Sequence, residues 1–270
     1  MSVVVTRTIA GRGEVERLQV LNEEVVNCRK CPRLVAHREQ IGIVQRRAYR
    51  GQEYWCRPVR GFGDSQARLL IVGLAPGAHG ANRTGRIFTG DRSGDYLYRA
   101  LFEAGFANQP ESVSQQDGLV LRDAYITCPV RCVPPDNKPT REEILECRPF
   151  LIRELACLKN VKVVVVLGGI GLQAYLSVLQ AEGRIKSRAP FRFAHGATFR
   201  PYKDGPLVLA SYHPSQQNTS TKRLTAEMLR EIFLLSRQLI QDEPSRSAEY
   251  PEDNESLAAF PKCGKAAKIV

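Results

Sequence analysis

The stretch ARLLIVGLAPGAHGANRTGRIFTGD covers residues 67–91. Its first eight residues are mostly apolar, and such a short run before a glycine-rich segment predicts a buried strand. A glycine-rich loop after a strand usually holds phosphate, but this loop has neither the Walker lysine nor the glycine spacing of a dinucleotide site. It carries His79, Asn82, Arg83 and Arg86 instead, and it ends at Asp91. The stretch therefore predicts a ligand site of another kind at the end of a strand.

Three more apolar runs predict strands, and helical patterns separate them. The strand runs cover 123–130, 161–169 and 206–213, and the helical patterns cover 93–105, 140–158, 169–181 and 224–240. Ser93 is a candidate N-cap, and Thr140 and Glu143 have the spacing of a capping box. Apolar strands that alternate with helices predict an α/β fold, in which helices cover both faces of a parallel sheet.

Ligands of such a sheet bind beyond the carboxyl ends of its strands. We expect the polar segments there to form one crevice that gathers His79, Asn82, Phe88, Asp91, Asn137, His213 and Asn218. The chain has no GxxxxGK[ST] motif, and the second predicted strand ends without a carboxylate that could bind magnesium. Both observations argue against phosphoryl transfer.

The chain has 270 residues, 43% of them hydrophobic, which suits one large domain with a sizeable core. We expect a single domain over residues 1–241, including an N-terminal arm, and a mobile polar tail over 242–270. No apolar run approaches the roughly 18 residues of a membrane helix. The first ten residues lack the pattern of a secretory signal. We expect a soluble, cytoplasmic protein and a monomer.

The net charge is +11, and the positive excess lies outside the last thirty residues, which are net acidic. A basic surface favours a polyanionic partner, of which nucleic acid is the commonest. One candidate surface consists of arginines interleaved with aromatic residues, although solvated surface charge is the alternative interpretation. Its members are Arg46, Arg47, Arg50, Arg57 and Arg60, with Tyr49, Tyr54 and Trp55.

Four of the eight cysteines form a candidate metal centre. Cys28 and Cys31 have a Cys-x2-Cys spacing, and Cys132 and Cys147 have a Cys-x14-Cys spacing. Zinc and [4Fe–4S] clusters both accept four thiolates, and the spacing leaves both open. Alternatively, Cys132 and Cys147 are small buried apolar side chains. Cys28 lies among basic residues, which favours ligation.

Three sequence features together resemble family 5 uracil-DNA glycosylases, the type-B enzymes that are related to family 4. They are GLAPGAHGANRTGRIFTGD at 73–91, SYHPSQQNTSTKRLT at 211–225 and the four cysteines, and EYWCRPVRGFGD at 53–64 resembles the family's lead-in. The resemblance covers about residues 18–240. It implies a three-layer α/β/α sandwich with a central four-stranded parallel sheet, a [4Fe–4S] cluster on the four cysteines, and excision of uracil from DNA. The choice of iron over zinc comes from this resemblance.

Two positions differ from the related family 4 enzymes. Those begin the loop with Gly-Glu-Ala-Pro, and here Leu74 stands in the Glu position. They also read the uracil edge with an Asn, and here that position looks like Cys128. A site that demands fewer hydrogen bonds rejects other bases less strongly. We therefore expect hypoxanthine, damaged pyrimidines and mismatched bases as further substrates.

The resemblance also implies roles at the site. Phe88 is the expected stacking platform for a flipped base, unless it belongs to the core. His213 is expected to donate to a base carbonyl, and Asp91 to orient the water, unless it only caps the following helix. Asn82 and His79 are reserve residues for positioning that water. The other expected substrate contacts are Gly73, Ala75, Pro76, Gly77, Ala78, Cys128, Ser215 and Asn218.

DNA is the expected partner, and its phosphates are expected to bind basic side chains near the site. The predicted contacts are Arg83, Arg86, Lys222 and Arg223. The cluster is expected to be structural and to clamp the N-terminal arm onto the sheet. The alternative is a non-enzymatic iron–sulfur protein that binds DNA or senses redox state. Such a protein would need neither Asp91 nor His213.

Overall fold

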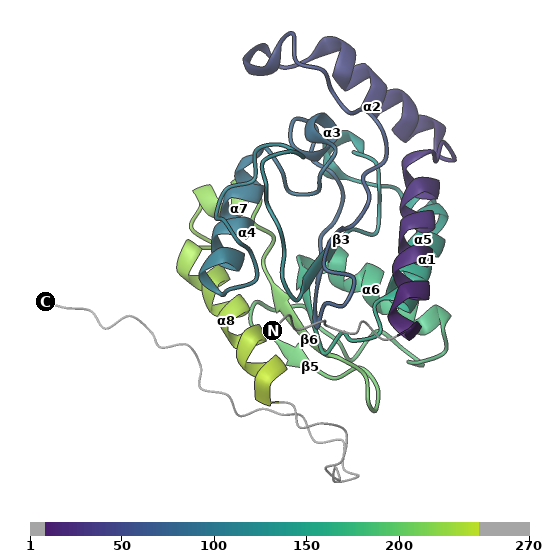
Figure 1. Ribbon diagram of the computed structural model, residues 1–270, viewed down its shortest axis with the longest axis vertical. Coiled ribbons are helices and arrows are strands. Elements are labelled where there is room, and N and C mark those ends of the chain that lie inside the picture. The colour runs from purple at the N-terminus through teal and green to yellow at the C-terminus, as the bar shows by residue number, and fades with distance from the viewer. Residues whose placement is uncertain (1–8, 243–270) are drawn as a thin grey trace, which may run out of the picture.

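A six-stranded sheet forms the centre of the computed structural model, which describes residues 9–242 (Figure 1). Its strands lie in the order β1-β3-β2-β4-β6-β5. They are β1 Phe62–Gly63, β2 Leu69–Val72, β3 Ala124–Thr127, β4 Val163–Leu167, β5 Thr198–Phe199 and β6 Leu207–Ser211. The four middle strands are parallel to one another, and they are the four that the apolar runs predict.

The two edge strands were not predicted. β1 runs antiparallel to β3, and β5 runs antiparallel to β6. The expected four-stranded sheet is therefore extended by one short strand at each edge. Each of these strands has only two residues, so no periodic pattern marks them in the sequence.

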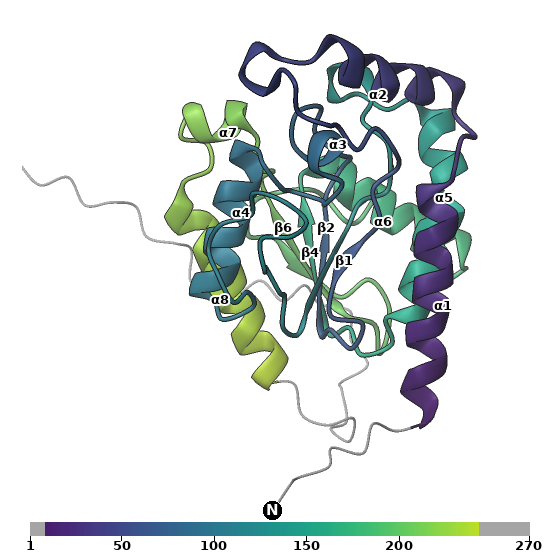
Figure 2. The ribbon, with the colours of Figure 1, turned by 45° about the horizontal axis from the view of Figure 1, so that its top comes forward.

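Successive side chains of the parallel strands enter two separate cores. Leu69 and Ile71 pack in one core with residues of α4 and α8, whereas Leu70 and Val72 pack in the other with residues of α1, α5 and α6. Both faces are buried, which explains why each strand is apolar throughout. Figure 2 shows the three layers, with α4 and α8 on one side of the sheet and α1, α5 and α6 on the other. The predicted α/β/α sandwich is confirmed.

The helices of residues 9–242 include the four that the sequence predicts. They are α1 Ile9–Val26, α2 Pro32–Val44, α3 Ala81–Thr84, α4 Arg92–Glu103, α5 Arg141–Cys157, α6 Gly169–Ala181, α7 Gln216–Ser220 and α8 Ala226–Asp242, with 3-10 turns η1 Arg47–Tyr49 and η2 Pro135–Asn137. The capping box of α5 is present, because Thr140 and Glu143 each accept the other's backbone N–H. The cap of α4 is Asp91 and not Ser93.

The N-terminal arm is helical, which the sequence did not predict. α1 packs along α5, and α2 crosses above the carboxyl end of the sheet (Figures 1 and 2). The predicted tail over 242–270 lies outside the described residues, apart from Asp242 at the end of α8. Among residues 9–242, no helix is long and apolar enough to cross a membrane.

The strand order identifies where a ligand would bind. The chain passes from β2 to β3 on one side and then returns to β4 on the other side of β2. The topological switch point therefore lies between β2 and β4, and open α/β sheets bind ligands at the carboxyl ends of the strands there. Residues 73–91 follow β2 at this point, and His213 follows β6 beside β4.

Candidate functional site

The Phe88 ring lies at the carboxyl end of β2, against Gly73 and His213. A Cβ on Gly73 would come within 3.0 Å of Phe88 Cε2, so the ring rests directly on the end of the strand. The centroids of the Phe88 and His213 rings are 5.7 Å apart, and the rings are tilted by 34°. Two segments that are remote in sequence therefore meet where the sequence predicts a crevice.

Phe88 has a left-handed backbone with φ 51°. This region is sparsely populated by residues other than glycine. Gly94 in the first turn of α4 allows this conformation, since a Cβ there would lie 1.9 Å from the Phe88 carbonyl oxygen. The Phe88 side chain is 8% exposed and packs in the core with α4 and α8. By its packing Phe88 is therefore a core residue, as the alternative interpretation expected, and its stacking on a flipped base stays a prediction.

Asp91 presents its two oxygens to different groups. Oδ1 accepts the Gly94 N–H at 3.0 Å, so the expected capping role is confirmed. Oδ2 faces the loop after β2, where Cβ atoms on Gly80 and Gly77 would lie 1.8 and 2.9 Å from it. Only residues without a side chain leave room for this carboxylate. Burial raises the pKa of Asp91, although the bond from Gly94 opposes that rise.

His213 is held by its own loop. Its carbonyl accepts a hydrogen bond from Asn218 Nδ2 at 2.8 Å, and Ser215 caps α7 by accepting the Asn218 N–H. Ser215 and Asn218 therefore fix the His213 backbone. Burial lowers the pKa of His213 to about 4, so its imidazole is neutral at neutral pH. A neutral imidazole still has one N–H to donate.

His79 and Asn82 bind the N-terminal arm instead. His79 Nδ1 lies 3.1 Å from the Tyr54 hydroxyl, and its ring centroid is 6.1 Å from that of Tyr49. Asn82 is 1% exposed, and its Nδ2 donates to the Arg38 carbonyl at 3.2 Å. These bonds direct His79 Nδ1 and Asn82 Nδ2 toward the arm, and a role of either residue in positioning the water stays a prediction.

Cys128, Asn137 and Ala75 were also expected at the site. Cys128 is fully buried in the core with α4 and α8, and its thiol donates to the Val130 carbonyl at 3.2 Å. It therefore offers nothing to a base, contrary to the expectation. Asn137 is exposed in η2, with φ 56°. Ala75, in the loop that Phe88 adjoins, packs against the cysteines.

The loop arginines bond within the fold, which corrects the prediction of a DNA contact for the buried Arg86, whereas a DNA contact of Arg83 stays a prediction. Arg86 is 5% exposed and forms a bidentate ion pair with Asp117, so it cannot reach a phosphate. The Arg83 guanidinium donates to the carbonyls of His79 and Gly90, and its Nη1 donates to a Gln52 side chain. These bonds use all three nitrogens of Arg83 to tie the loop together.

Basic side chains remain exposed on two sides of the site. Lys222 and Arg223 follow α7, and the Arg223 guanidinium lies 4.6 Å from the centre of the Tyr212 ring. On the other side, the arm presents the exposed Arg46, Arg47 and Arg50. These residues follow Ile43 and Val44, which are 78% and 66% exposed at the end of α2. Arg83 lies 4.1 Å above the Tyr49 ring and so connects this surface to the loop.

The four predicted cysteine ligands line one small cavity. Cys28 and Cys31 lie in the connection between α1 and α2, Cys132 in the segment after β3 and Cys147 in α5. Cys132 and Cys147 pack with Leu34 and Val130, and Cys31 and Ala75 border this group. Among residues 9–242, no three His, Cys, Asp or Glu side chains are arranged to hold a metal ion.

Two buried arginines also line this cavity, and within the described part of the chain only one of them forms an ion pair with a carboxylate. Arg131 pairs with the buried Glu154, with Nη2 and Oε2 2.5 Å apart. Arg38 is 2% exposed, and its Nη1 donates to Cys132 Sγ at 2.9 Å and to the Cys28 carbonyl at 3.4 Å. No carboxylate among the described residues pairs with Arg38. A buried charge is costly unless an opposite charge lies near it.

Sequence reasoning missed Arg38 and the Arg86–Asp117 pair. Their burial has no local signal, because arginine is usually exposed and reads as surface charge. An i, i+4 pattern on α2 places Leu34 and Arg38 on one face, and this pattern could have indicated that Arg38 faces the cysteines.

Comparison with known proteins gives one consistent family. The model of the uracil DNA glycosylase superfamily matches residues 60–234. A type-5 uracil-DNA glycosylase of Mycobacterium leprae is 52% identical over 214 residues, which are 79% of this chain and 91% of the relative. One of Thermus thermophilus is 52% identical over 212 residues, 78% of this chain and 93% of the relative. A type-4 uracil-DNA glycosylase of Pyrobaculum aerophilum is 31% identical over 163 residues, 60% of this chain and 66% of the relative.

Proposed function

The chain belongs to the uracil-DNA glycosylase superfamily, and we propose from this premise that it is a DNA repair enzyme that removes uracil. It hydrolyses the N-glycosidic bond and leaves an abasic site. The observation that supports the proposal beyond the family is the contact between the Phe88 and His213 rings, which come from segments far apart in the chain. Asp91 lies three residues after Phe88, and its Oδ2 faces the loop after β2 at the same end of the sheet. This is the expected location of a ligand site in an open α/β sheet.

The target nucleotide must first leave the base stack, because its glycosidic bond is inaccessible inside a duplex. We assign the first contact with the flipped base to Phe88. Its ring borders His213, and its position on Gly73 leaves it no freedom to retreat into the sheet. Stacking on an aromatic ring is worth about 1–3 kcal/mol per base and is tolerant of base identity.

His213 then stabilises the departing base. As the glycosidic bond breaks, negative charge develops on the base, and preorganised N–H donors stabilise such charge most effectively. The lowered pKa of His213 keeps the ring neutral, so it donates a hydrogen bond without giving up a proton. The backbone N–H groups of residues 75–78 supply further donors in the adjoining loop.

Asp91 orients the attacking water. Its Oδ2 faces the loop after β2, while Oδ1 is fixed by the helix cap. A carboxylate held in this way can bind a water molecule and offset the positive charge that develops on the sugar. The raised pKa of Asp91 means that the carboxyl ionises at a higher pH than an exposed aspartate, and only the ionised form serves this role.

The range of bases is broader than uracil in this proposal. Cys128 stands where a family 4 enzyme has the Asn that reads the uracil edge, and its buried thiol is occupied by the Val130 carbonyl. Hypoxanthine and damaged pyrimidines would meet no demand for a specific edge pattern from this residue.

A labelled oligonucleotide with a single uracil tests the function. Incubation with the protein is expected to leave an alkali-labile abasic site, and an otherwise identical oligonucleotide with thymine is expected to stay intact. A panel with hypoxanthine and 5-hydroxymethyluracil then measures base selection. Tight binding of the uracil oligonucleotide without any strand break after alkali treatment would support the non-enzymatic alternative instead.

DNA beside the lesion binds the exposed surface formed by Ile43, Val44, Arg46, Arg47 and Arg50 in this proposal. Apolar side chains flanked by arginines suit insertion along a distorted duplex. Charge supports the assignment, since residues 41–60 hold five arginines against one acidic residue, Glu53. The surface is joined to the loop of the site through Arg83 and Tyr49.

The arm surface predicts a change in the salt dependence of DNA binding. Each lost phosphate contact reduces the slope of log K against log salt by about 1. We expect Arg46→Ser/Arg47→Ser to reduce this slope by about 2, as measured by fluorescence anisotropy with a duplex. The control is Arg122→Ser/Lys203→Ser, which removes two exposed charges at the amino end of the sheet. Equal effects of the two double variants would rule out a specific role for the arm.

The four cysteines hold a [4Fe–4S] cluster in this proposal. They line one cavity, and a single ion would need all four sulfurs within about 2.3 Å of one point, whereas a cubane binds each thiolate at a separate iron. Arg38 supports an anionic group here, because its buried charge forms no ion pair with a carboxylate of residues 9–242. The cluster would supply a structural cross-link between the arm and the sheet. A reducing cytoplasm would keep the other cysteines as thiols.

A further inference from the structure

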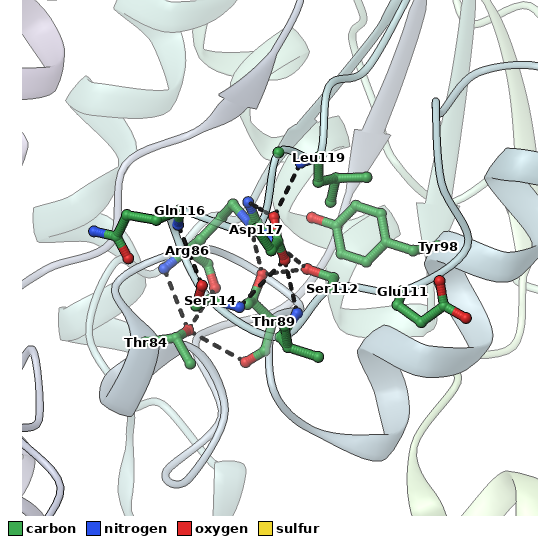
Figure 3. A network of polar contacts seen from close by, with 12 residues as sticks. Thr84, Arg86, Thr89, Tyr98, Glu111, Ser112, Ser114, Gln116, Asp117 and Leu119 are labelled. Carbon is green, nitrogen blue, oxygen red and sulfur yellow. Dashed lines mark hydrogen bonds and ion pairs between the residues drawn. The ribbon is translucent and has the colours of Figure 1, made fainter.

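The left-handed backbone of Phe88 is held by bonds to the residues around it. A non-glycine residue in this region persists only where its surroundings fix it firmly. The Tyr98 hydroxyl donates to the Ile87 carbonyl at 2.9 Å, on one side of Phe88. Thr84 Oγ1 donates to the Thr89 carbonyl at 3.2 Å, on the other side. Figure 3 shows Thr84, Thr89 and Tyr98 together.

A buried arginine connects this turn to a second segment. Arg86 Nε donates to Thr89 Oγ1 at 2.9 Å, and its Nη2 donates to Ser112 Oγ at 2.8 Å. The same guanidinium pairs with both Asp117 oxygens, at 2.9 and 2.5 Å. The Ser112 carbonyl in turn accepts the Gly90 N–H at 2.8 Å. Residues 112–119 therefore hold the turn that contains Arg86 and Thr89 in place, and we call this segment the brace (Figure 3).

Asp117 organises the brace. Its carboxylate accepts the backbone N–H groups of Val113, Ser114 and Leu119 in addition to Arg86. Burial would raise the pKa of Asp117, but the bonds from Arg86 and these backbone groups outweigh it and lower the pKa to about 2. One carboxylate thus shapes residues 112–119 and anchors them to the turn that carries Phe88.

We propose that residues 112–119 position the Phe88 ring for the flipped base, with Asp117 as the positioning residue. The inference rests on the proposed function, because it assigns Phe88 to base stacking. The Phe88 backbone is in a sparsely populated conformation. Hydrogen bonds to Ile87 and Thr89, on either side of Phe88, keep it there. Arg86 connects Thr89 to Asp117, because its guanidinium bonds to both. Without the Asp117 carboxylate the turn relaxes and the ring leaves its place on Gly73.

The test compares Asp117→Asn with a matched variant at the opposite end of the sheet. Asp123 also pairs with an arginine, Arg68, and also has a positive φ, 57°, but it lies before β3 at the amino end of the strands. We expect Asp117→Asn to lower kcat/KM for a uracil oligonucleotide about tenfold, the loss that follows from one weakened base stack. Asp123→Asn is expected to keep the wild-type value per folded molecule.

Binding to an abasic oligonucleotide separates positioning from loss of folded protein. This product has no base to stack, so Asp117→Asn is expected to bind it with the wild-type Kd and stoichiometry. Hydrogen exchange at the Gly90 N–H, which bonds to Ser112, is expected to accelerate in Asp117→Asn alone. If Asp117→Asn fails to fold, Ser112→Ala removes the two hydroxyl bonds to Arg86 and Thr89 and keeps the ion pair, with a smaller loss in the same direction.

Two results would overturn the inference. One is wild-type excision of uracil by folded Asp117→Asn, and the other is an equal loss of abasic-site binding and excision in that variant. A wild-type protein that excises no uracil would contradict the proposed function instead, and hydrogen exchange at Gly90 would still report whether Asp117 holds the turn.

Discussion

Uracil excision by His213→Ala is expected to be about 100- to 1000-fold slower than by the wild type, the usual loss when one preorganised donor to a developing anion is removed. The loss should appear in kcat, because the donor acts on charge that forms only as the glycosidic bond breaks. Single-turnover excision from a uracil oligonucleotide measures it. The control is His195→Ala, since His195 stacks on Tyr212 beside the same strand but accepts a bond from the Tyr212 N–H. Similar losses in both variants would contradict the role of His213.

The pH dependence of activity and of stability provides a second test of His213. The pKa of His213 is lowered to about 4, so protonation of this ring does not reduce wild-type activity until the pH approaches that value. The unfolded chain, with an ordinary histidine pKa near 6.5, binds the proton first. Between these two values the unfolded state holds more protons, so stability falls as the pH falls. His213→Ala should lack this part of the pH dependence in thermal melts between pH 7 and 4.

Replacement of one cysteine of the cavity is expected to have the largest effect on stability. Cys132→Ser should lose iron and lower the melting temperature by about 10–20 °C. The cysteine pairs are about a hundred residues apart, and a cross-link that closes such a loop contributes about 4–5 kcal/mol to the free energy of unfolding. Each kcal/mol corresponds to about 2–4 °C in melting temperature for a domain of this size. Iron content, visible absorbance and a thermal melt measure the outcome.

Cys157→Ser is the matched control for this prediction. Cys157 is a buried cysteine at the end of α5, the helix that also carries Cys147, but it does not line the cavity. This variant should keep its iron and a melting temperature close to that of the wild type. A colourless protein that contains zinc would reverse the choice of metal, and Cys132→Ser with an unchanged melting temperature would contradict a structural role for the centre.

The sequence predicted the elements whose signal is local. Four continuous apolar runs gave the four parallel strands, and the Thr140–Glu143 spacing gave the start of α5. The convergence of the loop after β2 with His213 followed from the rule that ligand sites lie at the carboxyl ends of parallel strands. Local signals did not decide between Ser93 and Asp91 as the cap of α4, because both residue types cap helices well.

Features that depend on distant partners could not be predicted. Arg86 reads as a surface charge, and its partner Asp117 lies in another loop, beyond α4. Asn82 and His79 look like site residues until the arm is placed, because Arg38 and Tyr54 bind them from outside the loop. These polar side chains of the motif thus bond within the fold, and Phe88 and Asp91 are the residues of the motif to which we assign the chemistry.

Successive side chains of the strands point to opposite faces of the sheet, so the molecule has two cores that protein engineering can treat separately. Phe88 and Cys128 pack in the core of α4 and α8, whereas Cys28 borders the core of α1, α5 and α6. The sheet separates the two, so the effects on stability of substitutions that lie far apart in opposite cores should add. A designer could therefore strengthen each core separately.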